Sequence, residues 1–122
     1  MSNDLFRNYV AEVKSRIREV SVEDYLKEVA TGAKPVLIDV REASEVVRGH
    51  APDAILISRG ILEGEIEDEI TDLSTPVVLS CASGNRSAFA AESLQRMGYT
   101  NVRSLAGGFK AWAAAGQPVV KS

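Results

Sequence analysis

The stretch that decides the fold runs Val77-Val78-Leu79-Ser80-Cys81-Ala82-Ser83-Gly84-Asn85-Arg86-Ser87 and continues as Ala88-Phe89-Ala90-Ala91-Glu92-Ser93-Leu94. It opens on a short apolar run, passes through small and polar residues, and ends in a segment with helical composition. The pattern predicts a buried strand, a tight loop and a helix. Cys81, the only cysteine of the chain, stands where the strand becomes the loop.

The loop after Cys81 is suited to hold negative charge. Backbone N–H groups of a loop that closes onto a helix N-terminus point at whatever it encloses, and the helix dipole adds about half a positive charge there. Gly84 permits a positive φ and close approach of the backbone to an anion. We therefore expect a thiolate nucleophile at Cys81. The alternative is a small buried cysteine at the end of a core strand.

The composition indicates one globular domain. The chain has 122 residues, 45% of them hydrophobic and 25% charged, and a formal net charge of -3. A negative net charge does not favour binding to nucleic acid or to an anionic membrane. One cysteine and one histidine provide neither an intrachain disulfide nor a set of zinc ligands. Because no apolar run approaches the ~18 residues of a membrane span, and the N-terminus lacks the apolar core of a signal peptide, we expect a cytoplasmic protein.

The N-terminal segment predicts an amphipathic helix over residues 2–20. Ser2, Asn3 and Asp4 are good N-cap residues, and apolar side chains follow at three- and four-residue spacing. These apolar residues are Leu5, Phe6, Tyr9, Val10, Val13, Ile17 and Val20. We expect the apolar stripe to pack on the domain; docking to a partner or a second subunit is the alternative.

The remaining segments alternate between strand and helix patterns. Apolar runs predict strands at 36–40, 54–57, 77–80 and 102–105. Helices are predicted at 22–30, 43–47, 61–70, 86–97 and from 109 onward. This alternation predicts a parallel sheet covered on both faces, in which ligands bind beyond the carboxyl ends of the strands. Cys81 lies at such an end.

Four charged residues near the predicted site have more than one interpretation. Asp39 ends a buried strand, where an unpaired carboxylate is costly, so it either meets a cation or binds a ligand. We expect the first, in an ion-pair network with Arg41 that supports the loop. Arg86 either ties the loop to Asp39 or another carboxylate, or contacts a bound anion. Arg59, at the carboxyl end of a predicted strand, either lines the opening of the Cys81 site or is a solvated turn residue.

With these segments in place, the sequence resembles the rhodanese family of sulfurtransferases, specifically its single-domain members, over about residues 19–120. The motifs that carry the resemblance are Asp39-Val40-Arg41-Glu42, Gly49-His50-Ala51-Pro52-Asp53-Ala54-Ile55, Cys81-Ala82-Ser83-Gly84-Asn85-Arg86-Ser87, and Leu105-Ala106-Gly107-Gly108-Phe109-Lys110-Ala111-Trp112 with Ala115-Gly116-Gln117-Pro118-Val119. The resemblance implies a three-layer α/β fold with a mostly parallel sheet of about five strands. It makes 19–122 the rhodanese domain and 1–18 an N-terminal helical extension.

The resemblance also implies that Cys81 cycles between thiolate and persulfide. It would take a sulfane sulfur from a small anionic donor such as thiosulfate, or from a persulfide, and pass it to a thiol, to cyanide or to a protein acceptor. Neither a metal nor an organic cofactor is implied. The residues that would bind substrate are Ala82, Ser83, Gly84, Asn85, Arg86 and Ser87, with Arg59 a further candidate. His50 lies in a family turn motif, so we expect a hydrogen-bonded turn residue rather than a general base for Cys81.

Two features of the loop bear on the substrate. Four residues separate Cys81 from Arg86, whereas the related phosphatases and arsenate reductases have five, so the smaller loop favours one sulfur atom over a tetrahedral oxyanion. Ala82 stands where efficient users of thiosulfate often carry a basic residue, which favours a persulfide donor instead. A non-enzymatic sulfur carrier or regulatory module, and less so a small phosphatase or arsenate reductase, are the alternatives.

Overall fold

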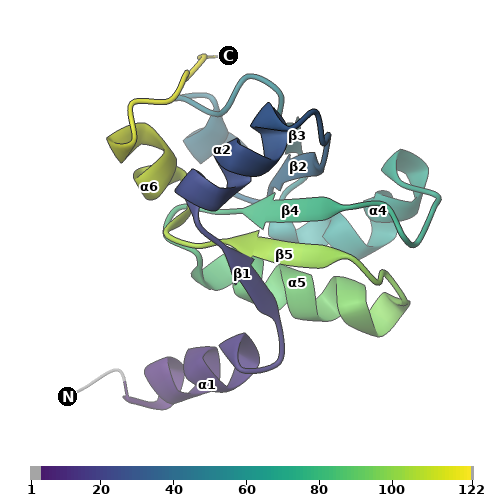
Figure 1. Cartoon of the computed structure of the whole chain (residues 1–122). Helices are drawn as coiled ribbons and strands as arrows, with labels where there is room; N and C mark the ends of the chain where they lie inside the picture. The colour runs from purple at the N-terminus through teal and green to yellow at the C-terminus, as the bar shows by residue number, and fades with distance from the viewer. Residues whose placement is uncertain (1–3, 122) are drawn as a thin grey trace.

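A five-stranded parallel sheet lies between two layers of helices in the computed structural model, which describes residues 4–121 (Figure 1). The strands are β1 Arg18–Val20, β2 Val36–Asp39, β3 Ile55–Leu56, β4 Val77–Ser80 and β5 Val102–Leu105. Their order across the sheet is β1-β5-β4-β2-β3, and every neighbouring pair is parallel. The predicted three-layer α/β fold is therefore confirmed. Because all strands point the same way, their carboxyl ends meet at one edge.

The helices divide between the two faces of the sheet. They are α1 Asp4–Lys14, α2 Val22–Ala30, α3 Ala43–Val46, α4 Leu62–Glu69, α5 Asn85–Met97 and α6 Gly108–Ala114, with a 3-10 turn η1 at Arg59–Ile61. Helices α4 and α5 lie on one side of the sheet and α2 and α6 on the other (Figure 1). Each pair covers its own cluster of buried side chains. Among residues 4–121, no helix has the length and apolar character needed to cross a membrane.

Strand β4 lies at the centre of the sheet and carries the site. Its residues alternate between the two faces, as strand geometry requires: Val77 and Leu79 face α4 and α5, and Val78 faces α2 and α6. All four residues of the strand are buried. A strand covered on both faces is mostly apolar, which explains the run Val77-Val78-Leu79.

The predicted N-terminal helix over 2–20 is wrong in its last third. Helix α1 ends at Lys14, and Arg18–Val20 form the edge strand β1, which pairs with β5. The apolar spacing of Val13, Ile17 and Val20 fits a helix. Parallel pairing with an existing strand instead satisfies the backbone of Arg18–Val20, and Val20 joins the core under α2 and α6. The predicted N-cap residues 2 and 3 lie outside the described residues.

Helix α1 packs on α5 at the outside of the molecule. Val10 and Val13 are buried, and the ring of Phe89 on α5 lies 5.0 Å from that of Tyr9, centroid to centroid. Leu5 remains 89% exposed. The apolar stripe of α1 therefore packs on α5, the helix that follows Cys81, but Leu5 at the start of the stripe is open to solvent.

Candidate active site

The sulfur of Cys81 is held at the carboxyl end of β4, at the start of a tight turn. The residue is 1% exposed, and the Gly84 amide donates a hydrogen bond of 3.1 Å to Sγ. Gly84 has φ +102° and is the N-cap of α5. Because that backbone conformation is strained for other residues, the glycine sets the turn that brings an amide onto the sulfur. We call residues 81–86 the Cys81 loop.

The other amides of the predicted cradle are arranged differently. Within residues 4–121, the amide of Gly84 is the only one that hydrogen-bonds Sγ. Asn85, Arg86 and Ser87 form the first turn of α5, where backbone N–H groups have no intrahelical partner. Ala82 is half-buried and Ser83 exposed. The loop thus combines one amide bound to the thiol with several at a helix N-terminus, the arrangement that favours an anion.

Two buried hydroxyls lie behind the sulfur. Ser87 Oγ is 3.4 Å from Cys81 Sγ, and Ser104 Oγ is 2.7 Å from Ser87 Oγ. Ser87 belongs to α5 and Ser104 to β5, so the contact joins a helix to the strand beneath it. The sulfur is therefore contacted by an amide on one side and by a hydroxyl on another.

The N-terminal end of α6 is hydrogen-bonded to the backbone of the Cys81 loop. The amide of Phe109 donates to the carbonyl of Cys81 at 2.7 Å, and that of Lys110 to the carbonyl of Ala82 at 3.1 Å. A Cβ on Gly108 would overlap the Cys81 carbonyl oxygen, and the residue has φ +55°. The double glycine of the sequence motif therefore lets α6 approach the loop closely.

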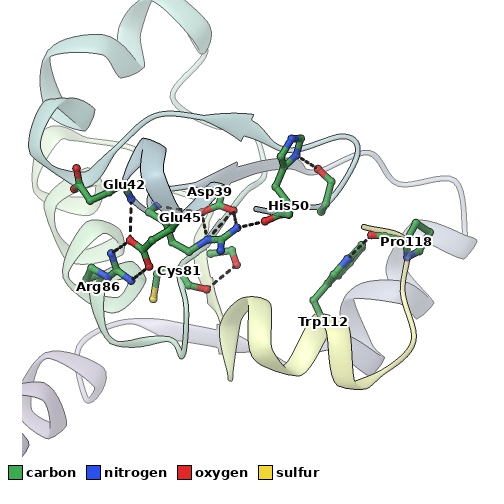
Figure 2. Close-up of polar contacts among 12 residues, drawn as sticks. Asp39, Glu42, Glu45, His50, Cys81, Arg86, Trp112 and Pro118 are labelled. Carbon is green, nitrogen blue, oxygen red and sulfur yellow. Dashed lines mark hydrogen bonds and ion pairs between the residues drawn. The ribbon is translucent and has the colours of Figure 1, made fainter. Parts of the chain in front are cut away.

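Arg86 is paired with Glu45, the third residue of the short helix α3. Its guanidinium donates to both carboxylate oxygens, at 2.7 and 2.9 Å (Figure 2). The hydrogen bonds from Arg86 lower the pKa of Glu45 from 4.5 to about 2, against the effect of burial, and the amide of Glu42 helps. The same pair raises the pKa of Arg86. Of the two interpretations of Arg86, the structure shows a carboxylate partner, and that partner is Glu45 rather than Asp39.

Asp39 and Arg41 form a buried ion pair, as expected. Their side chains are 4% and 6% exposed, and Arg41 Nη2 lies 2.7 Å from an oxygen of Asp39. Arg41 also donates to the carbonyl of Gly49 at 2.8 Å, and its guanidinium lies 4.3 Å above the ring of Phe109. A buried pair with all these partners holds β2, the turn at Gly49 and α6 together. It supports the site without contacting the sulfur.

A cleft of about 350 Å³ lies between α3 and α6, beside the Cys81 loop. It is lined by Arg41, Ser44, Glu45, Arg48, Gly49 and Phe109. Two of these residues also contact the loop: Glu45 pairs with Arg86, and the amide of Phe109 donates a hydrogen bond to the carbonyl of Cys81. Arg48 is exposed, and no other side chain among residues 4–121 pairs with it. It is the cleft's uncompensated positive charge.

The remaining predicted residues lie outside this cluster. Arg59 pairs with Glu63 at 2.7 Å and donates to Ser93 at 3.1 Å, so its guanidinium is engaged between α4 and α5 and does not line the cleft. His50 Nδ1 lies 2.9 Å from the carbonyl of Ala51, in the turn where the motif placed it. Within the described part of the chain, no group of three His, Cys, Asp or Glu side chains is arranged to hold a metal ion.

Sequence reasoning missed two residues of the site, Glu45 and Ser104. Glu45 is one acidic residue among several on exposed helices, and nothing local marks it as the partner of Arg86. Ser104 did carry a signal: a serine within an apolar strand run has to find a hydrogen-bond partner. Its partner, Ser87, is 17 residues away in sequence, so the pair could be recognised only once the strand and helix were in place.

Comparisons with known proteins show which family this chain and its fold resemble. The model of the rhodanese-like domain matches residues 21–115. A protein from Rhodopseudomonas palustris, described as of unknown function and a possible tyrosine phosphatase, is 32% identical, with 91% of this chain and 90% of that chain covered and a TM-score of 0.79. The polysulfide-sulfur transferase homodimer of Wolinella succinogenes is 27% identical over 98% of this chain and 90% of its own, with a TM-score of 0.83. A human single-domain sulfurtransferase is 26% identical over 79% and 95%, with a TM-score of 0.69.

Proposed function

This chain belongs to the rhodanese-like domain family, and from that premise we propose that it is a sulfurtransferase that carries a sulfane sulfur on Cys81. The observation that carries the proposal is the contact of the Gly84 amide with Sγ at the N-terminus of α5. The sulfurtransferase neighbours from Wolinella succinogenes and human support the same activity class. A single free cysteine suits a reducing compartment such as the cytoplasm.

The transfer takes two displacement steps. First, the Cys81 thiolate attacks the sulfane sulfur of the donor; the donor's S–S bond breaks, and its electron pair leaves with sulfite when thiosulfate is the donor, or with a thiolate when a persulfide is. Second, an acceptor thiolate or cyanide attacks the outer sulfur of the Cys81 persulfide. The electron pair of that S–S bond returns to Cys81, which becomes a thiolate again.

The charges around the loop bear on the choice of donor. Arg86, Arg41 and Arg59 each have a carboxylate partner, and position 82 is alanine. The loop therefore offers a small dianion such as thiosulfate little free positive charge. Arg48, which lines the adjoining cleft, is an exposed cation without a carboxylate partner among residues 4–121. We propose that persulfides with an anionic tail are better donors than thiosulfate, because the tail can reach the cleft while the sulfur occupies the loop.

A phosphatase is the second candidate, because one neighbour is described as a possible tyrosine phosphatase. Phosphoryl transfer needs fixed positive charge on the equatorial oxygens of the transferred group. Here the loop arginine is bound to both oxygens of Glu45, and the loop is one residue short of the phosphatase length implied by the resemblance. These features favour sulfur transfer. Turnover of an aryl phosphate by wild type and its loss in Cys81→Ser would reverse that preference.

The experiment that tests the proposal is a mass measurement. Wild type incubated with thiosulfate or with glutathione persulfide is expected to gain the mass of one sulfur atom, and Cys81→Ser is expected to gain none. Addition of cyanide or a small thiol should then remove the sulfur. If wild type gains no sulfur from either donor, the proposal fails. A persulfide that forms but passes its sulfur only to one protein partner would identify a sulfur carrier rather than an enzyme.

A further inference from the structure

The two hydroxyls behind Cys81 form a short hydrogen-bonded chain that ends at the sulfur. Ser104 Oγ is 2.7 Å from Ser87 Oγ, which is 3.4 Å from Cys81 Sγ. Both serines are 0% exposed. Within residues 4–121, the hydroxyl of Ser104 has no hydrogen-bond partner other than Ser87, and Ser87 has none besides Ser104 and Cys81.

A count of hydrogens shows that this chain is not satisfied when Cys81 is a thiol. Three hydrogens are then present, one on sulfur and one on each hydroxyl, but there are only two contacts to fill. Whichever way the hydroxyls turn, one buried hydrogen is left without an acceptor. Such a group is costly in a protein interior. The chain can place the orphan hydrogen on Ser104, on Ser87 or on Cys81, but cannot remove it.

The thiolate removes the surplus hydrogen. The Ser104 hydroxyl then donates to Ser87 Oγ, and the Ser87 hydroxyl donates to Sγ, so both contacts are filled and no hydrogen is left over. The sulfur receives this bond in addition to the one from the Gly84 amide. A hydroxyl that accepts one hydrogen bond donates a stronger one. Ser104 therefore acts on the sulfur through Ser87.

We propose that Ser104 is a positioning residue that turns the hydroxyl of Ser87 toward Cys81 and so holds Cys81 as a thiolate. The proposal deepens the sulfurtransferase function and rests on it for its purpose: the Cys81 thiolate is the nucleophile of the first step and the leaving group of the second. The hydroxyl chain itself is a property of the resting protein. It can be measured without any sulfur donor.

The test is the pH dependence of the Cys81 thiolate, followed by its ultraviolet absorbance and by the rate of alkylation with iodoacetamide. Ser87→Ala is expected to move the midpoint to higher pH by about one unit, since it removes a hydrogen bond to a charged atom. Ser104→Ala should move it by roughly half a unit, since it only weakens that bond. In Ser87→Ala, the further change Ser104→Ala should have no effect, because Ser104 has no other route to the sulfur.

The chain offers matched controls. Ser80 is buried next to Cys81 in sequence, but its hydroxyl donates to the Cys81 carbonyl, at 3.4 Å, and not to the sulfur, so Ser80→Ala should leave the midpoint unchanged. Ser104→Thr keeps the hydroxyl and should retain the wild-type midpoint. In wild type itself, the Ser87 hydroxyl proton should shift downfield in the NMR spectrum with the same midpoint as the thiolate. This last measurement needs no substitution that could unfold the chain.

An unchanged midpoint in folded Ser104→Ala overturns the proposal, and so does an additive shift in the double variant. The outcome is separate from that of the proposed function. Shifted midpoints in a protein that gains no sulfur would leave the hydroxyl chain intact and reject the transferase. If the protein gains sulfur but the midpoints of the variants are unshifted, the transferase stands and the role of Ser104 is rejected.

Discussion

Arg86 and Glu45 face each other in a two-pronged ion pair, 2.7 and 2.9 Å long, that joins the Cys81 loop to helix α3 (Figure 2). The loop arginine thus has a protein carboxylate as its partner. The side chains of Arg86 and Glu45 are 38% and 34% exposed, so solvent screens the pair in part. Its consequence is to hold the loop in position, and its strength depends on pH.

The first prediction concerns Glu45→Gln. The folded chain lowers the pKa of Glu45 from 4.5 to about 2, so the folded state binds that proton less readily than the unfolded state. The contribution of the pair to stability is complete above pH 4.5 and is lost as the pH falls toward about 2. With screening, we expect Glu45→Gln to reduce the free energy of unfolding by about 1 kcal/mol at neutral pH. Urea denaturation across this pH range measures it.

The difference between wild type and Glu45→Gln should shrink as the pH approaches the folded pKa of Glu45. Glu23→Gln is the control, because Glu23 pairs with Lys27 on the open surface of α2, where no measurable change is expected. A difference that is constant between neutral and strongly acidic pH would contradict the assignment of this pair.

The second prediction concerns Gly108→Ala. A methyl group there collides with the Cys81 carbonyl, and the residue has a positive φ, so α6 has to move away from the loop. We expect a loss of about 2–4 kcal/mol in the free energy of unfolding and a loss of persulfide formation. Gly64→Ala, in α4, is the matched control: a Cβ there meets nothing within 4 Å, and alanine favours the helix. Equal effects of the two changes would refute the close approach of α6.

The third prediction is that Ala82→Arg raises the use of thiosulfate. Position 82 is half-buried in the Cys81 loop, and an arginine there adds a cation with no carboxylate assigned to it. We expect kcat/KM for thiosulfate to increase about tenfold, the effect of one charge-assisted hydrogen bond. Sulfite release measures it. Ala82→Gln adds comparable bulk without charge and should show no increase; a gain in both variants would point to size instead.

The fourth prediction is that Arg48→Gln lowers kcat/KM for anionic substrates and not for neutral ones. The acceptors to compare are 3-mercaptopropionate, which carries a carboxylate, and 2-mercaptoethanol, which is neutral. We expect about a tenfold loss of kcat/KM for the first and little change for the second. Lys34→Gln removes an exposed charge ahead of β2, at the opposite edge of the sheet. If it causes the same loss, the effect comes from overall charge and not from the cleft.

The fifth prediction tests the packing of α1. Val13 is 0% exposed and Leu5 is 89% exposed on the same helix. Val13→Ala is expected to lower the free energy of unfolding by about 2 kcal/mol, from lost burial and a cavity, and Leu5→Ala to leave it unchanged. Urea midpoints of both variants give the answer. No effect from Val13→Ala would show that α1 does not contribute to the stability of the folded domain.

Local pattern was sufficient for most of the architecture. The apolar runs that became β2, β4 and β5, the N-cap Ser21, whose side chain accepts from the amide of Asp24, and Gly98 at the end of α5 each depend on residues close together in the chain. Strand β1 is the exception. Three residues with one buried side chain carry no strand signal, and they extend only because β5 is there to pair with them.

The sequence by itself determined the parallel α/β fold and the position of Cys81 at the end of a central strand, before a glycine turn and a helix, because these follow from periodicity and turn chemistry over a few residues. Only the tertiary structure decided that Arg86 binds Glu45, that Gly108 lies against the Cys81 carbonyl, and that Ser104 reaches the sulfur through Ser87. The pairs Arg86–Glu45, Gly108–Cys81 and Ser104–Ser87 each join residues 17 or more positions apart in the chain. Hydrogen-bond and ion-pair partners are chosen by distance in space, which residue spacing along the chain does not encode.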